Sequence, residues 1–164
     1  MSEPDPFDAF VVDSYVSTTP TDGNKLLYMF VYDGDPTYAE VGTNVCPAPG
    51  RRMELRFKWM VRTDEDASCG ATGVPNWFNV RMQPHPDPST VLWHKAWADV
   101  CPLLVDSGDS FQTTTGWQEA VVEFEAPLAP STDDQRLVFT VGGYSAAGWV
   151  GLLDEVQLTP LDDE

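Results

Sequence analysis

The chain has 164 residues, 42% of them hydrophobic, which suits one domain with a substantial core and excludes a disordered chain. Its 26 acidic residues and nine lysines and arginines give a formal charge of −17, which repels nucleic acids and anionic lipid surfaces. No apolar run is long enough to span a membrane, so neither nucleic-acid binding nor membrane insertion is expected. Such acidity suits divalent cations and neutral ligands, and it equally serves solubility or a saline habitat.

Strand patterns dominate the first part of the chain. Residues 10–16 (FVVDSYV) and 25–32 (KLLYMFVY) are rich in β-branched and aromatic side chains, and the turn-forming sequence STTPTDGN separates them. Residues 53–62 (MELRFKWMVR) alternate between apolar and mostly charged side chains, which predicts a half-buried strand. The expected buried face of this strand holds Leu55, Phe57, Trp59 and Val61.

The rest of the chain repeats this pattern. Residues 77–82 (WFNVRM) predict a shorter strand with Phe78, Val80 and Met82 inward, and a helix is expected only at 92–100 (LWHKAWADV). Three further strands are predicted at 116–124, 135–143 and 148–158. Strands joined by Gly-, Pro- and Asp-rich turns indicate an all-β fold, an antiparallel β-sandwich of about eight strands. One domain covers 1–164 and ends in an acidic tail at 161–164.

The last predicted strand contains an acidic pair. In a regular strand Asp154 shares one face with the aliphatic residues Leu152, Val156 and Leu158. Glu155 lies on the opposite face with Gln157 and can reach water. A buried carboxylate without a partner is strongly destabilising. Asp154 is therefore expected to have a cation, an arginine or several backbone N–H groups as its partner.

Several short motifs resemble those of one fold family. A Thr-Gly-Trp sequence opens a strand at 115–117, an L-x-F-x-V strand follows at 137–141, and a Leu-Asp-acidic-Val-x-Leu strand closes the chain at 153–158. Together with 18–31 and 49–61, these segments resemble the galactose-binding-like jelly rolls, which include many carbohydrate-binding modules and domains of large bacterial surface adhesins. The resemblance covers most of the chain and implies a jelly-roll sandwich.

The resemblance also implies a structural calcium ion. In such modules the aspartate of the closing strand often helps to hold calcium together with oxygen atoms from the first strand, which designates Asp154 with Asp8 or Asp13 here. Backbone N–H donors or an arginine would satisfy Asp154 equally well, and both interpretations stay open. Where family members carry a further acidic site, this chain reads PNWFNV at 75–80, which argues against a second metal ion.

Aromatic residues are the candidates for ligand contact. Sugar rings stack on indole and phenol planes, while amide, carboxylate and guanidinium groups hydrogen-bond to their hydroxyls. Trp77, Trp93 and Trp97 lie in predicted loops or at strand ends, and Tyr144 follows a predicted strand. These four are the predicted ligand-binding residues, the alternative being that each packs onto its own scaffold. Trp117 is interpreted as a structural plug.

These features predict a non-catalytic binding module for a glycan or cell-surface polysaccharide, within a larger extracellular or cell-surface protein. The alternative is a structural or protein-binding domain of an adhesin or appendage. A glycan-active hydrolase is less favoured, because no nucleophile–base constellation is visible: the sequence around Ser145 lacks the glycine of a nucleophile elbow, and His94 has no neighbour at zinc-ligand spacing. The chain begins without a signal-peptide pattern.

The three cysteines allow one disulfide. Cys69 and Cys101 lie in the two long predicted connections, which favours a bridge between them and leaves Cys46 free. The alternative is three reduced thiols in a cytosolic protein.

Overall fold

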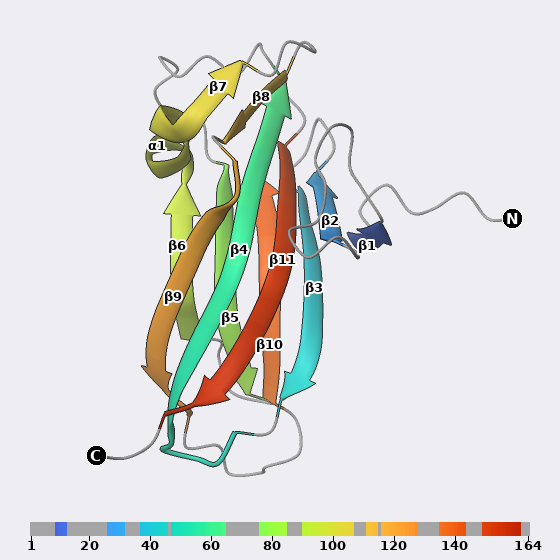
Figure 1. Ribbon diagram of the computed structural model, residues 1–164. Coiled ribbons are helices and arrows are strands. Elements are labelled where there is room, and N and C mark those ends of the chain that lie inside the picture. The colour runs from blue at the N-terminus through green and yellow to red at the C-terminus, as the bar shows by residue number, and fades with distance from the viewer. Residues whose placement is uncertain are drawn as a thin grey trace, which may run out of the picture.

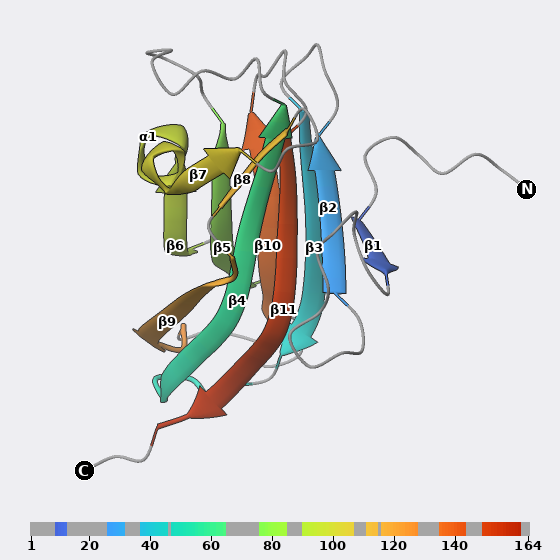
Figure 2. The same cartoon turned by 45° about the horizontal axis from the view of Figure 1, so that its top comes forward.

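The structure is a computed structural model that describes residues 9–12, 26–31, 37–45, 47–64, 76–84, 90–106, 111–114, 116–127, 135–143 and 149–161. This part of the chain forms eleven strands, one short α-helix and one 3₁₀ turn (Figure 1). The strands are β1 (Ala9–Val12), β2 (Leu26–Val31), β3 (Thr37–Val45), β4 (Arg52–Asp64), β5 (Trp77–Pro84), β6 (Thr90–Ala96), β7 (Leu104–Asp106), β8 (Phe111–Thr114), β9 (Gln118–Glu125), β10 (Gln135–Gly143) and β11 (Trp149–Pro160). The helix α1 (Trp97–Val100) and the turn η1 (Cys101–Leu103) follow β6 directly, at the end of that strand (Figure 2).

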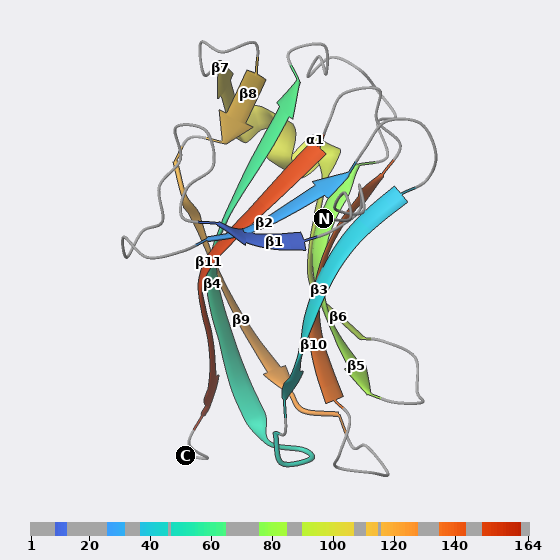
Figure 3. The ribbon, with the colours of Figure 1, turned by 90° about the vertical axis from the view of Figure 1, so that its right-hand side faces the viewer.

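The strands form two antiparallel sheets. The seven-stranded sheet has the order β1-β2-β11-β4-β8-β7, with β9 also pairing with the long strand β4, and the four-stranded sheet has the order β3-β10-β5-β6. Figure 3 shows the two layers from the side, with β3 and β10 bowed toward the seven-stranded sheet. The outer side of the four-stranded sheet is therefore concave, and that of the seven-stranded sheet is convex.

The core between the sheets follows the predicted alternation. Leu55, Phe57 and Val61 of β4 are fully buried, as are Phe78, Val80 and Met82 of β5, which confirms both predicted faces. An aromatic cluster joins the two layers: the Trp93 ring of β6 lies edge-on to Phe57, Trp59 and Phe78, with centroid separations of 5.2, 5.2 and 5.4 Å. Such edge-to-face pairs add to the stabilisation from apolar burial itself.

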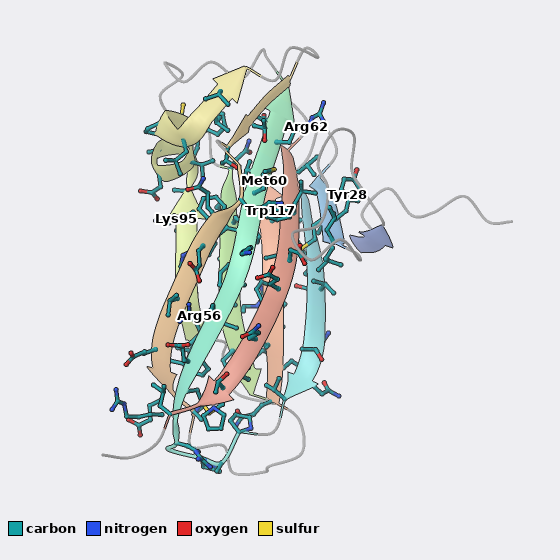
Figure 4. The ribbon with its side chains drawn as sticks, in the orientation of Figure 1. Tyr28, Arg56, Met60, Arg62, Lys95 and Trp117 are labelled. Carbon is teal, nitrogen blue, oxygen red and sulfur yellow. The ribbon has the colours of Figure 1, made fainter. Side chains whose placement is uncertain are left out.

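A second apolar cluster lies on the convex side. It consists of Leu26, Met60, Val150 and Leu152, with Tyr28 and Trp117 packed against it. Figure 4 looks onto this side and shows Trp117 beside Met60 over β4. The interpretation of Trp117 as a structural plug is confirmed.

The acidic pair of the closing strand coincides with a β-bulge. The register between β11 and β4 shifts between Asp154 and Gln157, so that Leu153 lies opposite Trp59 while Leu158 lies opposite Leu55. Two residues of β11 then oppose one residue of β4, and the two leucines share the core face although they are five positions apart. The prediction that Asp154 and Leu158 share a face was wrong, because the inserted residue reverses the alternation.

Hydrogen bonding explains why acidic residues occupy the bulge. Glu155 has a φ of 49°, an uncommon conformation for a non-glycine residue. Its N–H donates to Asp154 Oδ1 at 2.8 Å, and its carboxylate pairs with Lys58 Nζ at 2.9 Å. Asp154 is only 7% exposed and lies on the convex side with Leu152 and Met60. A backbone N–H was one of the partners expected for this buried carboxylate, and the Glu155 N–H supplies it.

Two elements differ from the predictions. Residues 37–45, assigned no structure from sequence, form β3, which pairs along its full length with β10. The predicted helix at 92–100 is a strand up to Ala96 and helical only from Trp97 to Val100, since residues 90–96 pair with β5. No helix in the described ranges is long and apolar enough to cross a membrane.

Cys101 is disulfide-bonded in the structure, which argues against three reduced thiols. The other cysteines, Cys46 and Cys69, lie outside the described residues. The predicted pairing of Cys69 with Cys101 stays a prediction.

Candidate functional site

The candidate site is the outer surface of the four-stranded sheet, which we call the concave face. Its residues are those that alternate with the core-facing residues of β10 and β5, together with their neighbours on β3 and β6. The outward Val138 and Thr140 of β10 are themselves buried. The strand register arranges them in rows across the sheet. The first row is Tyr38, Gly142, Trp77 and Ala96, and the second is Glu40, Thr140, Asn79 and His94.

An aromatic platform occupies the first row. A methyl group at Gly142 would overlap the six-membered part of the Trp77 indole, so the ring lies over the Gly142 backbone. Tyr38 lies on the other side of Gly142 and is 58% exposed. Trp77 and Tyr38 are thus two strand spacings apart, about 10 Å. The missing side chain at Gly142 allows the Trp77 indole to extend across the sheet.

Polar groups fill the second row and its neighbours. Arg81 on β5 donates from Nη2 to Glu40 Oε2 and from Nη1 to Thr140 Oγ1, both at 2.6 Å. Asn79 Oδ1 is buried and has no hydrogen-bond partner, and His94 beside it is exposed. The Arg81–Glu40 pair fixes the orientation of a donor and an acceptor next to the aromatic platform.

A second arginine lies further along the same face. Arg136 of β10 is exposed, and a methyl group at Gly42 of β3 would come within 2.8 Å of its guanidinium nitrogen. The guanidinium therefore lies over the Gly42 backbone. No carboxylate pairs with it in the part of the chain that the structure describes.

The convex face, formed by the outward residues of β4, β9 and β11, differs in its charge pairing. Its cations form a ladder of ion pairs: Arg52 with Glu123 at 2.9 Å, Arg56 with Glu119 at 2.9 Å and Glu54 at 3.3 Å, and Lys58 with Glu155 at 2.9 Å. Hydrogen bonds to Glu119 and Glu54 raise the pKa of the Arg56 guanidinium above its usual value. Each of these cations is therefore paired with a carboxylate on the same face.

The four residues predicted to contact a ligand lie in different parts of the structure. Trp77 lies on the concave face, half-buried and beside Gly142. Trp93 belongs to the aromatic core and Trp97 is 4% exposed, so neither position suits a ligand contact. Trp93 was predicted in a loop or at a strand end but lies within β6, whereas Trp97 directly follows the end of that strand and begins α1. Tyr144 lies outside the described residues.

Sequence reasoning missed most of this face. It did not find Tyr38, Glu40, Asn79, Arg81 and Arg136. A signal was present in β5, where Trp77, Asn79 and Arg81 alternate with the predicted buried residues. The residues on β3 had no such signal, because that strand itself went unrecognised.

The calcium hypothesis remains a prediction. Asp8 and Asp13 lie outside the described residues, and no cluster of three or more acidic, histidine or cysteine side chains suited to a metal ion occurs within the described ranges. The Asp154 carboxylate accepts a hydrogen bond from the N–H of Glu155, which fits the hydrogen-bonded alternative.

Comparisons with known proteins bear on the fold. No protein-family profile and no curated protein matches the sequence. A solved structure described as "CBM4 structure and function" matches with a TM-score of 0.50 and 15% identity, over 92% of this chain and 88% of that chain. The two-layer β-sandwich of this chain is thus similar in fold to that structure. The predicted all-β antiparallel sandwich of jelly-roll type is confirmed.

Two further solved structures are similar at lower TM-scores. The "K2 Cleaved Adhesin Domain of Lys-gingipain" matches with a TM-score of 0.48 and 14% identity, over 95% of this chain and 84% of that chain. A "Family 16 Carbohydrate Binding Module-2" matches with a TM-score of 0.42 and 18% identity, over 84% of this chain and 77% of that chain. At such low identities the ligand has to be inferred from the concave face itself.

Proposed function

We propose that this protein is a non-catalytic binding module whose concave face binds a glycan chain. The observation that carries the proposal is the Trp77 indole lying over Gly142 in one row with the exposed Tyr38. Pyranose rings present C–H faces that stack on such planes, which buries apolar surface without unsatisfied polar groups. The fold shared with a carbohydrate-binding module supports the same ligand class.

The polar groups beside the platform suit the hydroxyls of a sugar. The Arg81–Glu40 pair offers N–H donors and carboxylate acceptors whose orientation is set before a ligand arrives. His94, which is opposite Asn79 in the strand register, is exposed and offers a further polar group in the same row. A concave face with an aromatic end and a fixed polar centre favours an extended chain over a compact small molecule.

The proposal includes an extracellular or cell-surface setting within a larger protein. Disulfides persist mainly in oxidising compartments, and Cys101 is disulfide-bonded. The competing function is a structural or protein-binding domain of an adhesin, which would require no sugar site.

Calorimetric titration against a panel of soluble neutral polysaccharides tests the proposal. We expect the wild type to bind at least one of them and Trp77→Ala to weaken that binding roughly 30-fold, as for a central aromatic anchor. Val121→Ala is the control, because Val121 is 48% exposed on β9 in the other sheet. Loss of binding in both variants, or in neither, would contradict this site. Release of reducing sugar from a polysaccharide would instead favour a glycan-active hydrolase.

A further inference from the structure

We propose that the ligand of the concave face is a mainly neutral glycan that carries isolated carboxylate groups, and that Arg136 recognises one of them. This inference rests on the proposed glycan-binding function and specifies its substrate class. The evidence is a difference in ion pairing between the convex and concave faces. In a chain of formal charge −17, carboxylates are abundant, yet the described part of the chain provides none to pair with the Arg136 guanidinium.

The position of the guanidinium is set by the sheet. Gly42 leaves space for it above the β3 backbone, where any larger residue would displace it. Arg136 and Gly42 lie on adjacent strands, since Arg136 is opposite Asn44 in the register of β10 and β3. A planar guanidinium held against a sheet presents its outer N–H groups to solvent, and a carboxylate can accept two of them at once.

The spacing places Arg136 within reach of a chain that stacks on Trp77. Gly42 is four residues from Tyr38 along β3, which corresponds to about 13 Å by strand rise. Tyr38 is in the row of Trp77, and the Arg81–Glu40 pair lies between the two ends. One extended oligosaccharide can thus contact the aromatic platform, the polar centre and the guanidinium together.

Charge decides between a sparsely and a densely acidic ligand. Arg81 and Glu40 neutralise each other, so Arg136 leaves the described residues of this face with a small positive charge. A single guanidinium matches a single carboxylate. A polyanion with a carboxylate on every sugar would also meet the field of the remaining acidic protein, which repels it. A neutral backbone with occasional uronic acid groups avoids that repulsion.

The test uses glucuronoxylan, the same polymer after chemical reduction of its carboxylates, and polygalacturonate, each titrated at physiological salt. We expect the wild type to bind glucuronoxylan roughly three- to fivefold more tightly than the reduced polymer, as for an exposed ion pair, and to bind polygalacturonate more weakly than either. Arg136→Gln should bind the first two polymers equally. Gly42→Ala, which keeps the charge but displaces the guanidinium, should also reduce the discrimination.

The outcomes separate the two proposals. Equal binding of glucuronoxylan and its reduced form by the wild type, or discrimination that survives in Arg136→Gln, overturns the role of Arg136 and leaves glycan binding standing. Tightest binding of polygalacturonate overturns the sparse-carboxylate ligand. Trp77→Ala is expected to weaken both xylans, and binding of neither xylan by the wild type overturns both proposals for these ligands.

Discussion

The two outer faces of the sandwich use their charged residues differently. On the convex face Arg52, Arg56 and Lys58 each pair with carboxylates of β4, β9 or β11. On the concave face Arg81 makes one such pair, whereas Arg136 lies over a glycine without a partner among the described residues. Both faces belong to sheets whose inner sides are apolar, so packing of the core does not account for the difference.

Two glycines contribute to the difference between the proposed binding face and the convex face. Gly42 and Gly142 both lie on the concave face, and each is covered by a long side chain from a neighbouring strand. A long side chain that lies flat over a glycine exposes the plane of its ring or guanidinium group to solvent. A side chain surrounded by others of similar size packs against them instead. Among the described strands β9 pairs with β4 alone, and the charged side chains of the convex face oppose edge-to-edge association there.

The largest expected effect comes from filling the space beneath the aromatic platform. In Gly142→Ala the new methyl group would overlap the Trp77 ring, which has to move away from the sheet. We expect glycan affinity to fall roughly 30-fold, as in Trp77→Ala, and overpacking to cost about 1–3 kcal/mol of stability. Titration calorimetry and urea unfolding measure the two effects.

Gly42→Ala is the matched control for this variant. Its methyl group meets only the flexible end of Arg136, so neutral polysaccharides should bind as they do to the wild type. If Gly142→Ala retained full affinity for a neutral glycan, the Trp77 platform would have no part in binding.

An intermediate effect is expected at the bulge, on the convex side. Asp154→Ala removes the acceptor of the Glu155 N–H, which the bulge holds out of the strand ladder. We expect a loss of about 1–2 kcal/mol in the free energy of unfolding and no change in glycan affinity. Urea unfolding in calcium and in chelator measures it.

The same experiment decides the calcium hypothesis. A hydrogen-bonded Asp154 predicts the same loss of stability in both solutions. If calcium raised wild-type stability and Asp154→Ala removed that increase, the carboxylate would be a metal ligand after all.

The smallest effects compare one glutamate from each face. Glu123→Gln removes the partner of Arg52, an exposed pair, and should change stability by less than about 0.5 kcal/mol without affecting binding. Glu40→Gln releases the Arg81 guanidinium from a shorter and less exposed pair, and should lower glycan affinity roughly threefold. Equal effects of both substitutions on affinity would remove the functional distinction between the faces.

The sequence alone determined the fold class and the core. The alternation in residues 53–62 and 77–82 was sufficient to assign the buried faces of β4 and β5, because a half-buried strand repeats every two residues. The acidic pair at 154–155 correctly indicated that a carboxylate needed a partner. Its local cause, an inserted residue that reverses the alternation, is not visible in a pattern that assumes regular strands.

Only the tertiary structure decided where the candidate site lies. The concave face joins residues from β3, β5, β6 and β10, which are up to about a hundred positions apart in the chain. The alternation in residues 77–82 indicated that Trp77 faces away from the core, but nothing in the sequence indicated that Trp93 packs against the core. Pairing of residues 90–96 with β5 places Trp93 opposite the buried Val80 and so on the core face, and the sequence pattern did not show this pairing.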